Sequence, residues 1–114
     1  MPSRLFRHVR FAVLLLAAAA AAPARADDLP VIKVEMRDGV ILPAVIEVPA
    51  NTRFKLEISN TGQSPAEFES TELKREKALA AGSTSAIVFR TLDAGTYQVF
   101  DDFHPEAKAT LVAK

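Results

Sequence analysis

The chain has no cysteine and no tryptophan among its 114 residues, and it has only one tyrosine, two methionines and two histidines. Without cysteine no disulfide can form, so strand pairing and an apolar core must stabilise the fold. The absence of thiolates also excludes zinc fingers, iron–sulfur clusters, thiol proteases and type 1 blue-copper centres. Beyond residue 26 there is one histidine, His104, and one methionine, Met36. This scarcity excludes a multi-histidine zinc site and a methionine-rich copper chaperone.

The first 26 residues have the composition of a secretory signal peptide. Three arginines within the first ten residues precede an apolar run over residues 11–22, and the small-x-small sequence Ala24-Arg25-Ala26 follows. The apolar run has about a dozen residues, which is too short to span a bilayer. We therefore expect residues 1–26 to be cleaved on export, leaving one small domain over residues 27–114.

Removal of this segment changes the charge of the protein. The whole chain has 14 basic and 14 acidic side chains, but four of the arginines lie within residues 1–26. The remaining domain is therefore acidic, with a formal charge of about −4 on these counts. Nucleic acid is an unfavourable partner for such a domain, since phosphate binding requires a cluster of positive charge. Small cations are a more natural ligand.

Short segments in which apolar and polar residues alternate predict an all-β fold. The clearest alternation runs from Phe54 to Ser59, and it is typical of a strand with one buried face. The apolar segment 40–48 contains Pro43, which favours an edge strand or a bulge. Six or seven short strands separated by turns indicate a β-sandwich. The expected strands lie at 32–37, 40–48, 54–59, 66–70, 85–90, 96–101 and 110–113.

Residues 71–81 leave two interpretations open. Ser70 or Thr71 could cap a helix that ends at Gly82, and the intervening Leu, Lys, Glu and Ala residues favour helix locally. The alternative is a charged loop with an extended stretch near residues 76–80.

Three segments together resemble cupredoxin-like domains. Residues 43–51 read as a proline followed by an apolar strand and Val48-Pro49-Ala50, and the sequences at 81–84 and 93–97 match the Gly-Ser-Thr and Gly-Thr-Tyr elements of these domains. The resemblance covers residues 31–113. It implies a cupredoxin-like Greek-key β-sandwich of about seven strands.

Two further segments look like a narrower group. The sequences at 66–70 and 100–104 resemble the periplasmic cupredoxin-like proteins of bacterial ferrous-iron uptake systems, and Glu67-Phe68-Glu69 is similar to a Glu-Trp-Glu element in the cupredoxin domain of EfeO-type proteins. This resemblance implies a periplasmic protein that binds a copper or iron ion. It also implies a role in ferrous-iron oxidation and uptake, beside periplasmic iron-uptake proteins and an inner-membrane iron permease.

The resemblance places carboxylates where blue-copper proteins have soft ligands. The ligand loop of blue-copper proteins reads Cys-x-x-His-x-x-Met. When it is aligned with this sequence, Asp101 stands at the cysteine position, His104 at the histidine position and Ala107 at the methionine position. The upstream histidine falls on or beside Glu67. Carboxylates combined with one imidazole suit Fe(II), Fe(III), Mn(II), Cu(II) or Zn(II) rather than a fast blue-copper electron carrier.

Each candidate ligand also has an ordinary structural explanation. Glu67 and Glu69 share one strand face, where they could form a solvated edge or be neutralised by a cation. Strand alternation groups Asp102 with His104 and directs Asp101 elsewhere, unless a bulge brings all three together. Met36 could fill the core or supply an axial thioether. The candidate metal ligands are Glu67, Glu69, Asp101, Asp102, His104 and Met36.

Two other functions compete with metal binding. The first is a non-metal interaction module that uses the sandwich as a scaffold and docks a periplasmic or membrane partner through residues 71–81. The second is a small exported enzyme. The sequence has no Ser-His-Asp spacing, nucleophile elbow or phosphate loop, which argues against a hydrolase and leaves a ferroxidase-type role within a larger system open.

Overall fold

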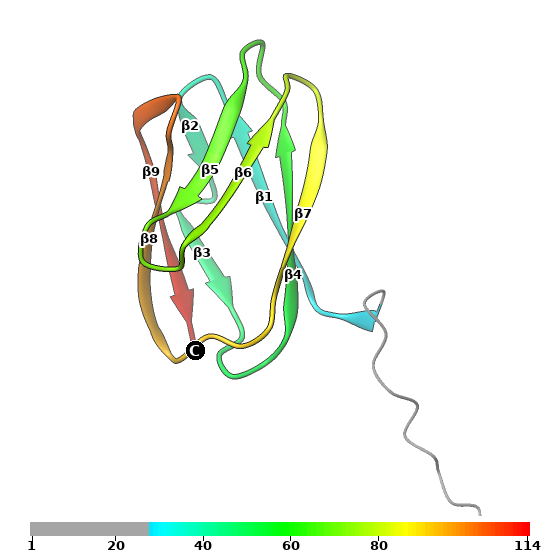
Figure 1. Ribbon diagram of the computed structural model, residues 1–114, viewed down its shortest axis with the longest axis vertical. Coiled ribbons are helices and arrows are strands. Elements are labelled where there is room, and N and C mark those ends of the chain that lie inside the picture. The colour runs from blue at the N-terminus through cyan, green and yellow to red at the C-terminus, as the bar shows by residue number, and fades with distance from the viewer. Residues whose placement is uncertain (1–27) are drawn as a thin grey trace, which may run out of the picture.

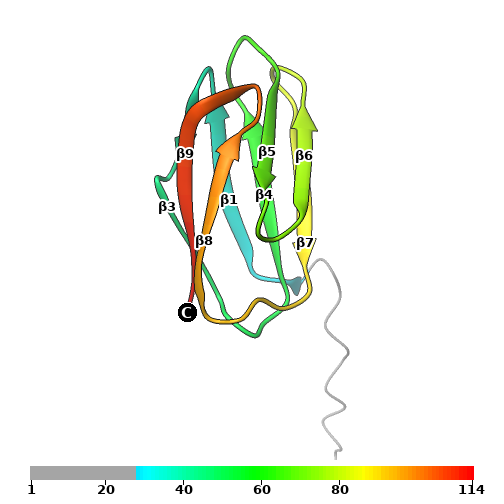
Figure 2. The ribbon, with the colours of Figure 1, turned by 60° about the vertical axis from the view of Figure 1, so that its left-hand side comes forward.

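The computed structural model describes residues 28–114, and it consists of two β-sheets packed face to face (Figures 1 and 2). The first sheet has the strand order β2-β1-β4-β7, and the second has the order β3-β9-β8-β5-β6. The predicted signal segment and its cleavage site lie outside the described residues. The nine strands are β1 (Val31–Arg37), β2 (Val40–Leu42), β3 (Val45–Val48), β4 (Phe54–Asn60), β5 (Ala66–Ser70), β6 (Arg75–Leu79), β7 (Thr84–Phe89), β8 (Gly95–Asp101) and β9 (His104–Ala113).

The all-β sandwich expected from the sequence is confirmed, with two more strands than the seven expected. One extra strand arises at Pro43, where the apolar segment 40–48 divides into β2 and β3. β2 pairs with β1 at the edge of the first sheet, and β3 pairs in parallel with β9 at the edge of the second. Proline has no N–H to donate to a ladder, so the chain changes sheets there and both strands are edge strands.

The second extra strand is β6, which decides between the two interpretations of residues 71–81. The helix is wrong and the extended alternative is correct. Lys74 has a φ of 53° and ends a tight turn in which its N–H donates to the carbonyl of Thr71 at 3.2 Å. The chain then pairs antiparallel with β5 from Ser70↔Arg75 to Ala66↔Leu79. Hydrogen bonds to an existing strand outweigh the weak local preference for helix.

Alternating side chains of both sheets form the core. In β4 the residues Phe54, Leu56 and Ile58 are fully buried, while the intervening residues are half-buried on the outer face. The rings of Phe54 and Phe89 stack with centroids 5.0 Å apart. β5 follows the same rule, because Phe68 is fully buried between two half-buried glutamates. The alternation seen in the sequence is thus the division between core and surface.

The loops at the upper end of the sandwich in Figure 1 hold the segments of interest. The turns β1–β2, β4–β5 and β8–β9 all lie at this end, although they are far apart in the sequence. Among residues 28–114 no helix is long and apolar enough to cross a membrane.

Candidate metal centre

The six residues expected to bind metal fall into three different places. Glu67, Glu69 and Asp102 meet on the outer face of the five-stranded sheet. Asp101 and His104 contact each other at the upper end of the sandwich. Met36 lies in the core. No single ion can therefore be bound by all six side chains, and each place has to be judged by its own geometry.

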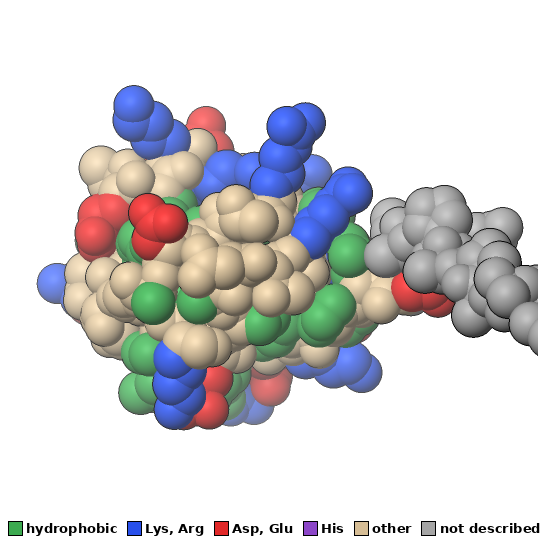
Figure 3. Space-filling model, turned by 90° about the horizontal axis from the view of Figure 1, so that it is seen from below, with side chains coloured by type: hydrophobic (Ala, Val, Ile, Leu, Met, Phe, Trp, Pro, Cys, Tyr) green, Lys and Arg blue, Asp and Glu red, His purple; other side chains and the backbone are tan. Residues whose placement is uncertain are grey.

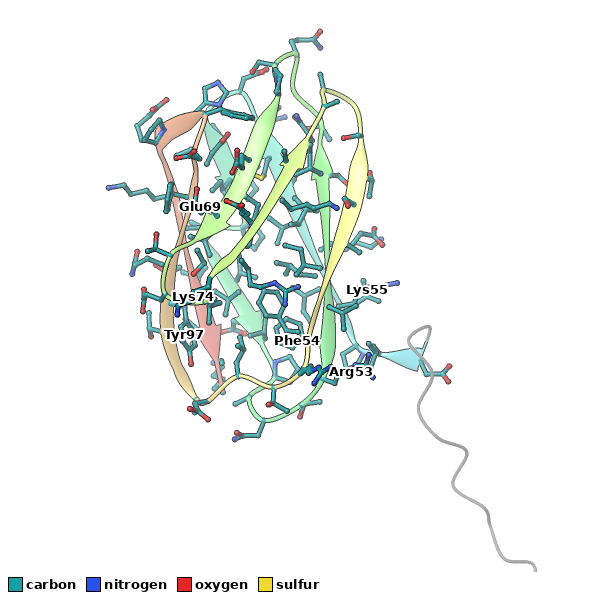
Figure 4. The ribbon with its side chains drawn as sticks, viewed as in Figure 1. Arg53, Phe54, Lys55, Glu69, Lys74 and Tyr97 are labelled. Atoms are coloured by element: carbon teal, nitrogen blue, oxygen red, sulfur yellow. The ribbon has the colours of Figure 1, made fainter. Side chains whose placement is uncertain are left out.

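We call the outer group the acidic cluster, and it comprises Glu67, Glu69, Glu76 and Asp102. Carboxylate oxygens of the three glutamates all lie within 4.8 Å of one another. Glu67 and Glu69 project from β5 on the side opposite Phe68, and Glu69, labelled in Figure 4, lies on β5. Asp102 joins them because its backbone N–H donates to the carbonyl of Glu67 at 2.9 Å. Three separate chain segments thus contribute carboxylates to one small area.

Strand register explains why Glu76 belongs to this cluster. Glu69 and Glu76 are direct partners in the antiparallel ladder between β5 and β6. Like charges directly opposite each other in a ladder destabilise it, so this pairing is unfavourable unless something neutralises it. A bound cation would do so.

The pKa values of Glu67 and Glu69 reflect partial burial and the like charges around them. Partial burial, followed by the charges of Asp102, Glu76 and Glu69, raises the pKa of Glu67 above its usual value. Partial burial and the charges of Asp102 and Glu76 raise the pKa of Glu69 in the same way. Ionisation of both glutamates is therefore less favourable in the folded protein than in the unfolded chain. A bound metal ion would offset this cost.

Asp101 and His104 form a different kind of site. Asp101 is only 2% exposed and faces inward, as its ladder partner Phe68 does. Its Oδ1 accepts hydrogen bonds from the backbone N–H groups of Glu67 and Phe103 at 2.9 and 3.0 Å. Its Oδ2 lies 2.9 Å from Nδ1 of His104. Both oxygens are occupied within the protein, so Asp101 is not placed as a ligand for an outside ion.

The remaining nitrogen of His104 faces a polar network rather than the acidic cluster. Its Nε2 lies 3.5 Å from the hydroxyl of Ser64, and that hydroxyl donates to Oδ1 of Asp38 at 2.9 Å. Asp38 also accepts from the backbone N–H groups of Gln63 and Ser64. These hydrogen bonds, of which that of the Ser64 hydroxyl has the largest effect, hold the pKa of Asp38 below its usual value. The network ties three loops together at the upper end.

This network has the residue types of a hydrolytic triad without the required geometry. The Ser64 hydroxyl donates its hydrogen bond to Oδ1 of Asp38, so its hydrogen is not directed at His104. The nearby backbone N–H groups of Gln63 and Ser64 both donate to Asp38 and are not free to stabilise an oxyanion.

Met36 fills the core. Its side chain is fully buried among the apolar residues between the sheets, whereas Glu67 and Glu69 lie on the opposite side of the second sheet. Of the two interpretations of Met36, packing is the one that the structure supports. Ala107, at the methionine position of the blue-copper loop, is also buried in the core.

Comparison with known proteins identifies the fold family. A family model described as a cupredoxin-like domain matches residues 10–113. The chain belongs to this family. An uncharacterized protein of Rickettsia prowazekii (strain Madrid E) is 34% identical over 80 residues, covering 70% of this chain and 64% of that protein. The chain thus spans just under two thirds of the length of this curated relative.

Solved structures agree on the fold. Reduced auracyanin of Roseiflexus castenholzii has a TM-score of 0.63 at 12% identity, covering 74% of this chain and 96% of that one. The purple cupredoxin of Nitrosopumilus maritimus has a TM-score of 0.56 at 16% identity, with coverages of 73% and 99%. The Cu(I)-bound metal-binding domain of the Streptococcus pneumoniae Cu(I)-exporting P-type ATPase CopA has a TM-score of 0.65 at 13% identity, with coverages of 74% and 84%. The cupredoxin-like fold is therefore related to that of copper-binding proteins.

A blue-copper ion of the kind that this fold suggests does not fit the residues present. The chain has no thiolate, and Asp101, at the cysteine position, has both oxygens in hydrogen bonds. The Nδ1 atom of His104 is also engaged. The hard carboxylates of the acidic cluster suit a different class of ion.

Proposed function

We propose that this cupredoxin-like chain binds an iron or copper ion through the acidic cluster and assists ferrous-iron oxidation and uptake. The observation that supports this most strongly is the convergence of Glu67, Glu69 and Glu76, whose carboxylate oxygens lie within 4.8 Å of one another. The raised pKa values of Glu67 and Glu69 supply a driving force for cation binding. The carboxylate of Asp102 supplies a further oxygen ligand for such an ion.

The oxygen donors suit iron in particular. Anionic oxygen ligands stabilise Fe(III) more than Fe(II), since the higher charge gains more from each carboxylate. A ferrous ion at the cluster would therefore lose one electron more readily and become Fe(III). The acceptor would be Cu(II), which one electron reduces to Cu(I), or dioxygen, which four such electrons and four protons reduce to water. The contribution of this chain is to hold the ferrous ion and to favour its oxidised state.

The setting of this role is part of the proposal. The signal-like sequence of residues 1–26 supports export to the periplasm, and the sequences at 66–70 and 100–104 resemble components of ferrous-iron uptake systems. We propose that the chain acts beside periplasmic iron-uptake proteins and an inner-membrane iron permease. Glu67 and Glu69, which carry the narrower resemblance, are also members of the acidic cluster.

Calorimetric titration with Fe(II) under anaerobic conditions, Mn(II) and Cu(II) tests the binding step. We expect one ion per chain, with a dissociation constant well below about 1 mM, the limit at which binding is worth only about 4 kcal/mol. The double variant Glu69→Gln, Glu76→Gln should weaken binding at least about tenfold, or about 1.4 kcal/mol. The matched control Glu57→Gln removes a half-buried glutamate from the outer face of the other sheet and should leave the affinity unchanged.

A second assay tests oxidation separately. The rate of Fe(II) loss with Cu(II) or dioxygen as acceptor should rise in the presence of the wild-type protein and not with the Glu69→Gln, Glu76→Gln variant. Tight binding without faster oxidation would limit the role to metal binding. If no metal binds more tightly than millimolar, the cluster is only a solvated surface.

The edge strand β6 supports a second candidate, the non-metal docking module. Residues 75–78 are exposed, and β6 has no neighbour on its outer side within the described sheet. Such an edge can pair with a strand from a partner protein. Absence of metal binding, together with intact folding, would favour this candidate.

A further inference from the structure

A groove at the lower end of the sandwich collects most of the arginines of the folded domain. Residues 28–114 contain four arginines, and three of them, Arg53, Arg75 and Arg90, line one groove of about 410 Å³. The other residues that line it are apolar or neutral, and none is acidic. Arg53 is labelled at the lower end in Figure 4, and Figure 3 shows Lys and Arg side chains standing out from this end. We call this feature the arginine groove.

Strand register forces two of these arginines together. Phe54 and Phe89 are partners in the antiparallel ladder between β4 and β7. Arg53 precedes Phe54 and Arg90 follows Phe89, so the same register, continued by one residue, places the two arginines opposite each other. Like charges in such positions are unfavourable without a counter-charge.

Arg75 reaches the groove from the other sheet and is already oriented there. Its guanidinium lies 5.0 Å from the centre of the Phe89 ring, and one of its N–H groups donates to the carbonyl of Val88 at 3.2 Å. Stacking on an aromatic ring holds the plane of a guanidinium and leaves its remaining N–H groups for a ligand.

None of the three arginines forms an ion pair within residues 28–114. The lysine and arginine ion pairs of that region are Arg37 with Glu35 and Lys114 with Glu47, both outside the groove. Three positive charges therefore gather in a domain whose overall charge is negative, with no acidic side chain among them. Their charges are left for a partner from outside.

We propose that the arginine groove is a binding site for a polyvalent oxyanion, a small molecule with several carboxylate or phosphate groups. Guanidinium groups form paired hydrogen bonds with both groups, which a lysine ammonium cannot do with the same geometry. The site shares no residue with the acidic cluster, but Arg75 also lines a neighbouring groove with Glu69 and Glu76, so the site is tested on the metal-free protein.

Titration of the metal-free protein with citrate and with inorganic phosphate, at constant ionic strength, tests this site. Calorimetry should give saturable binding with a dissociation constant of about 1 mM or tighter for at least one of the two anions. The amide signals of residues 88–92 and the side-chain N–H signals of the three arginines should shift in the NMR spectrum. Tighter binding of citrate would indicate a carboxylate ligand, and tighter binding of phosphate would indicate a phosphorylated one.

Variants separate a built site from general charge attraction. The double variant Arg53→Gln, Arg90→Gln should weaken anion binding at least about tenfold, because it removes two charged donors. The matched control Arg37→Gln removes the one arginine of the folded domain outside the groove and should leave the affinity unchanged. An equal loss in both variants, or no saturation by either anion up to about 10 mM, would overturn the proposal.

Discussion

Asp101 and Asp102 are neighbours in the sequence, but their carboxylates lie in opposite environments. Asp101 is buried and accepts from two backbone N–H groups and His104. Asp102 is exposed, and its charge adds to the effect of partial burial in raising the pKa values of Glu67 and Glu69. The first carboxylate is satisfied by the protein itself. The second adds to the negative charge of the acidic cluster, which forms no ion pair with a lysine or arginine among residues 28–114.

The same contrast separates the upper end of the sandwich from the outer face of the second sheet. Asp38 accepts hydrogen bonds from Gln63 and Ser64, which lower its pKa, whereas Glu67 and Glu69 have raised pKa values. Carboxylates that are satisfied by N–H and O–H donors hold loops together. Carboxylates that face one another are the ones that gain from a cation, and so residue type alone does not identify a ligand.

The largest expected loss of stability comes from removing the buried, hydrogen-bonded carboxylate of Asp101. Asp101→Ala leaves two backbone N–H groups and His104 without their buried acceptor, and it should lower the free energy of unfolding by about 3–5 kcal/mol. Urea denaturation measures this loss. Asp102→Asn, at the exposed neighbour, is the control and should change stability by no more than about 0.5 kcal/mol. Equal losses in the two variants would remove the contrast.

A smaller loss of stability is expected when a methyl group is added at Gly62, which lies against Asp38. A Cβ on Gly62 would lie 2.6 Å from Oδ1 and 2.8 Å from the backbone nitrogen of Asp38, so Gly62→Ala should cost about 1–3 kcal/mol. Gly82→Ala is the control, because Gly82 has a φ of 77° but nothing within 4 Å of its Cβ position. That substitution should cost about 1 kcal/mol from backbone strain alone. Thermal unfolding of both variants would show whether the upper end is tightly packed.

The lowered pKa of Asp38 predicts a contribution to stability that is lost at low pH. Its pKa is lower in the folded protein, so its ionised form stabilises the fold above the ordinary aspartate pKa of about 3.9. This contribution is lost as the pH falls through the lower, folded value. Asp38→Asn should therefore be less stable than the wild type at neutral pH, and the difference should shrink below about pH 4. A pH-independent difference would mean that the charge of Asp38 has no role.

The raised pKa of Glu69 predicts the opposite effect of pH on stability, and a smaller one. Its pKa is raised in the folded protein, so its ionised form disfavours folding at neutral pH and the penalty is relieved as the pH falls through the raised value. Metal-free Glu69→Gln should have a slightly higher Tm than the wild type at pH 7. This gain should disappear near and below the ordinary glutamate pKa of about 4.3. A lower Tm for the variant at pH 7 would show that Glu69 is already satisfied.

Strand alternation was enough to predict the sandwich and part of the acidic cluster. The burial of Phe68 between Glu67 and Glu69 follows directly from a period of two. The edge strands on either side of Pro43 follow instead from the missing N–H of proline. Glu76 escaped prediction because its role depends on the register of β6, a strand that local propensity does not favour. Its pairing with Glu69 can be seen only in the folded sheet.

The contact of Asp101 with His104 could not be read from alternation either. A register shift between Phe100 and Asp101 interrupts the ladder of β8 and β9, and it brings Asp101 rather than Asp102 to His104. Asp38 and Ser64 join through loops whose conformation depends on Gly62. The sequence marked these positions only as turns, because loop contacts of this kind come from tertiary packing.

The central claim is that a cation binds where carboxylates face one another. Mn(II) tests it directly, because a paramagnetic ion broadens the NMR signals of nearby residues. Substoichiometric Mn(II) added to the wild-type protein should broaden the amide signals of residues 67–69, 76 and 102 first, and the broadening should vanish in the Glu69→Gln, Glu76→Gln variant. Broadening centred on Ser64 and His104, or spread evenly over all acidic residues, would contradict the account.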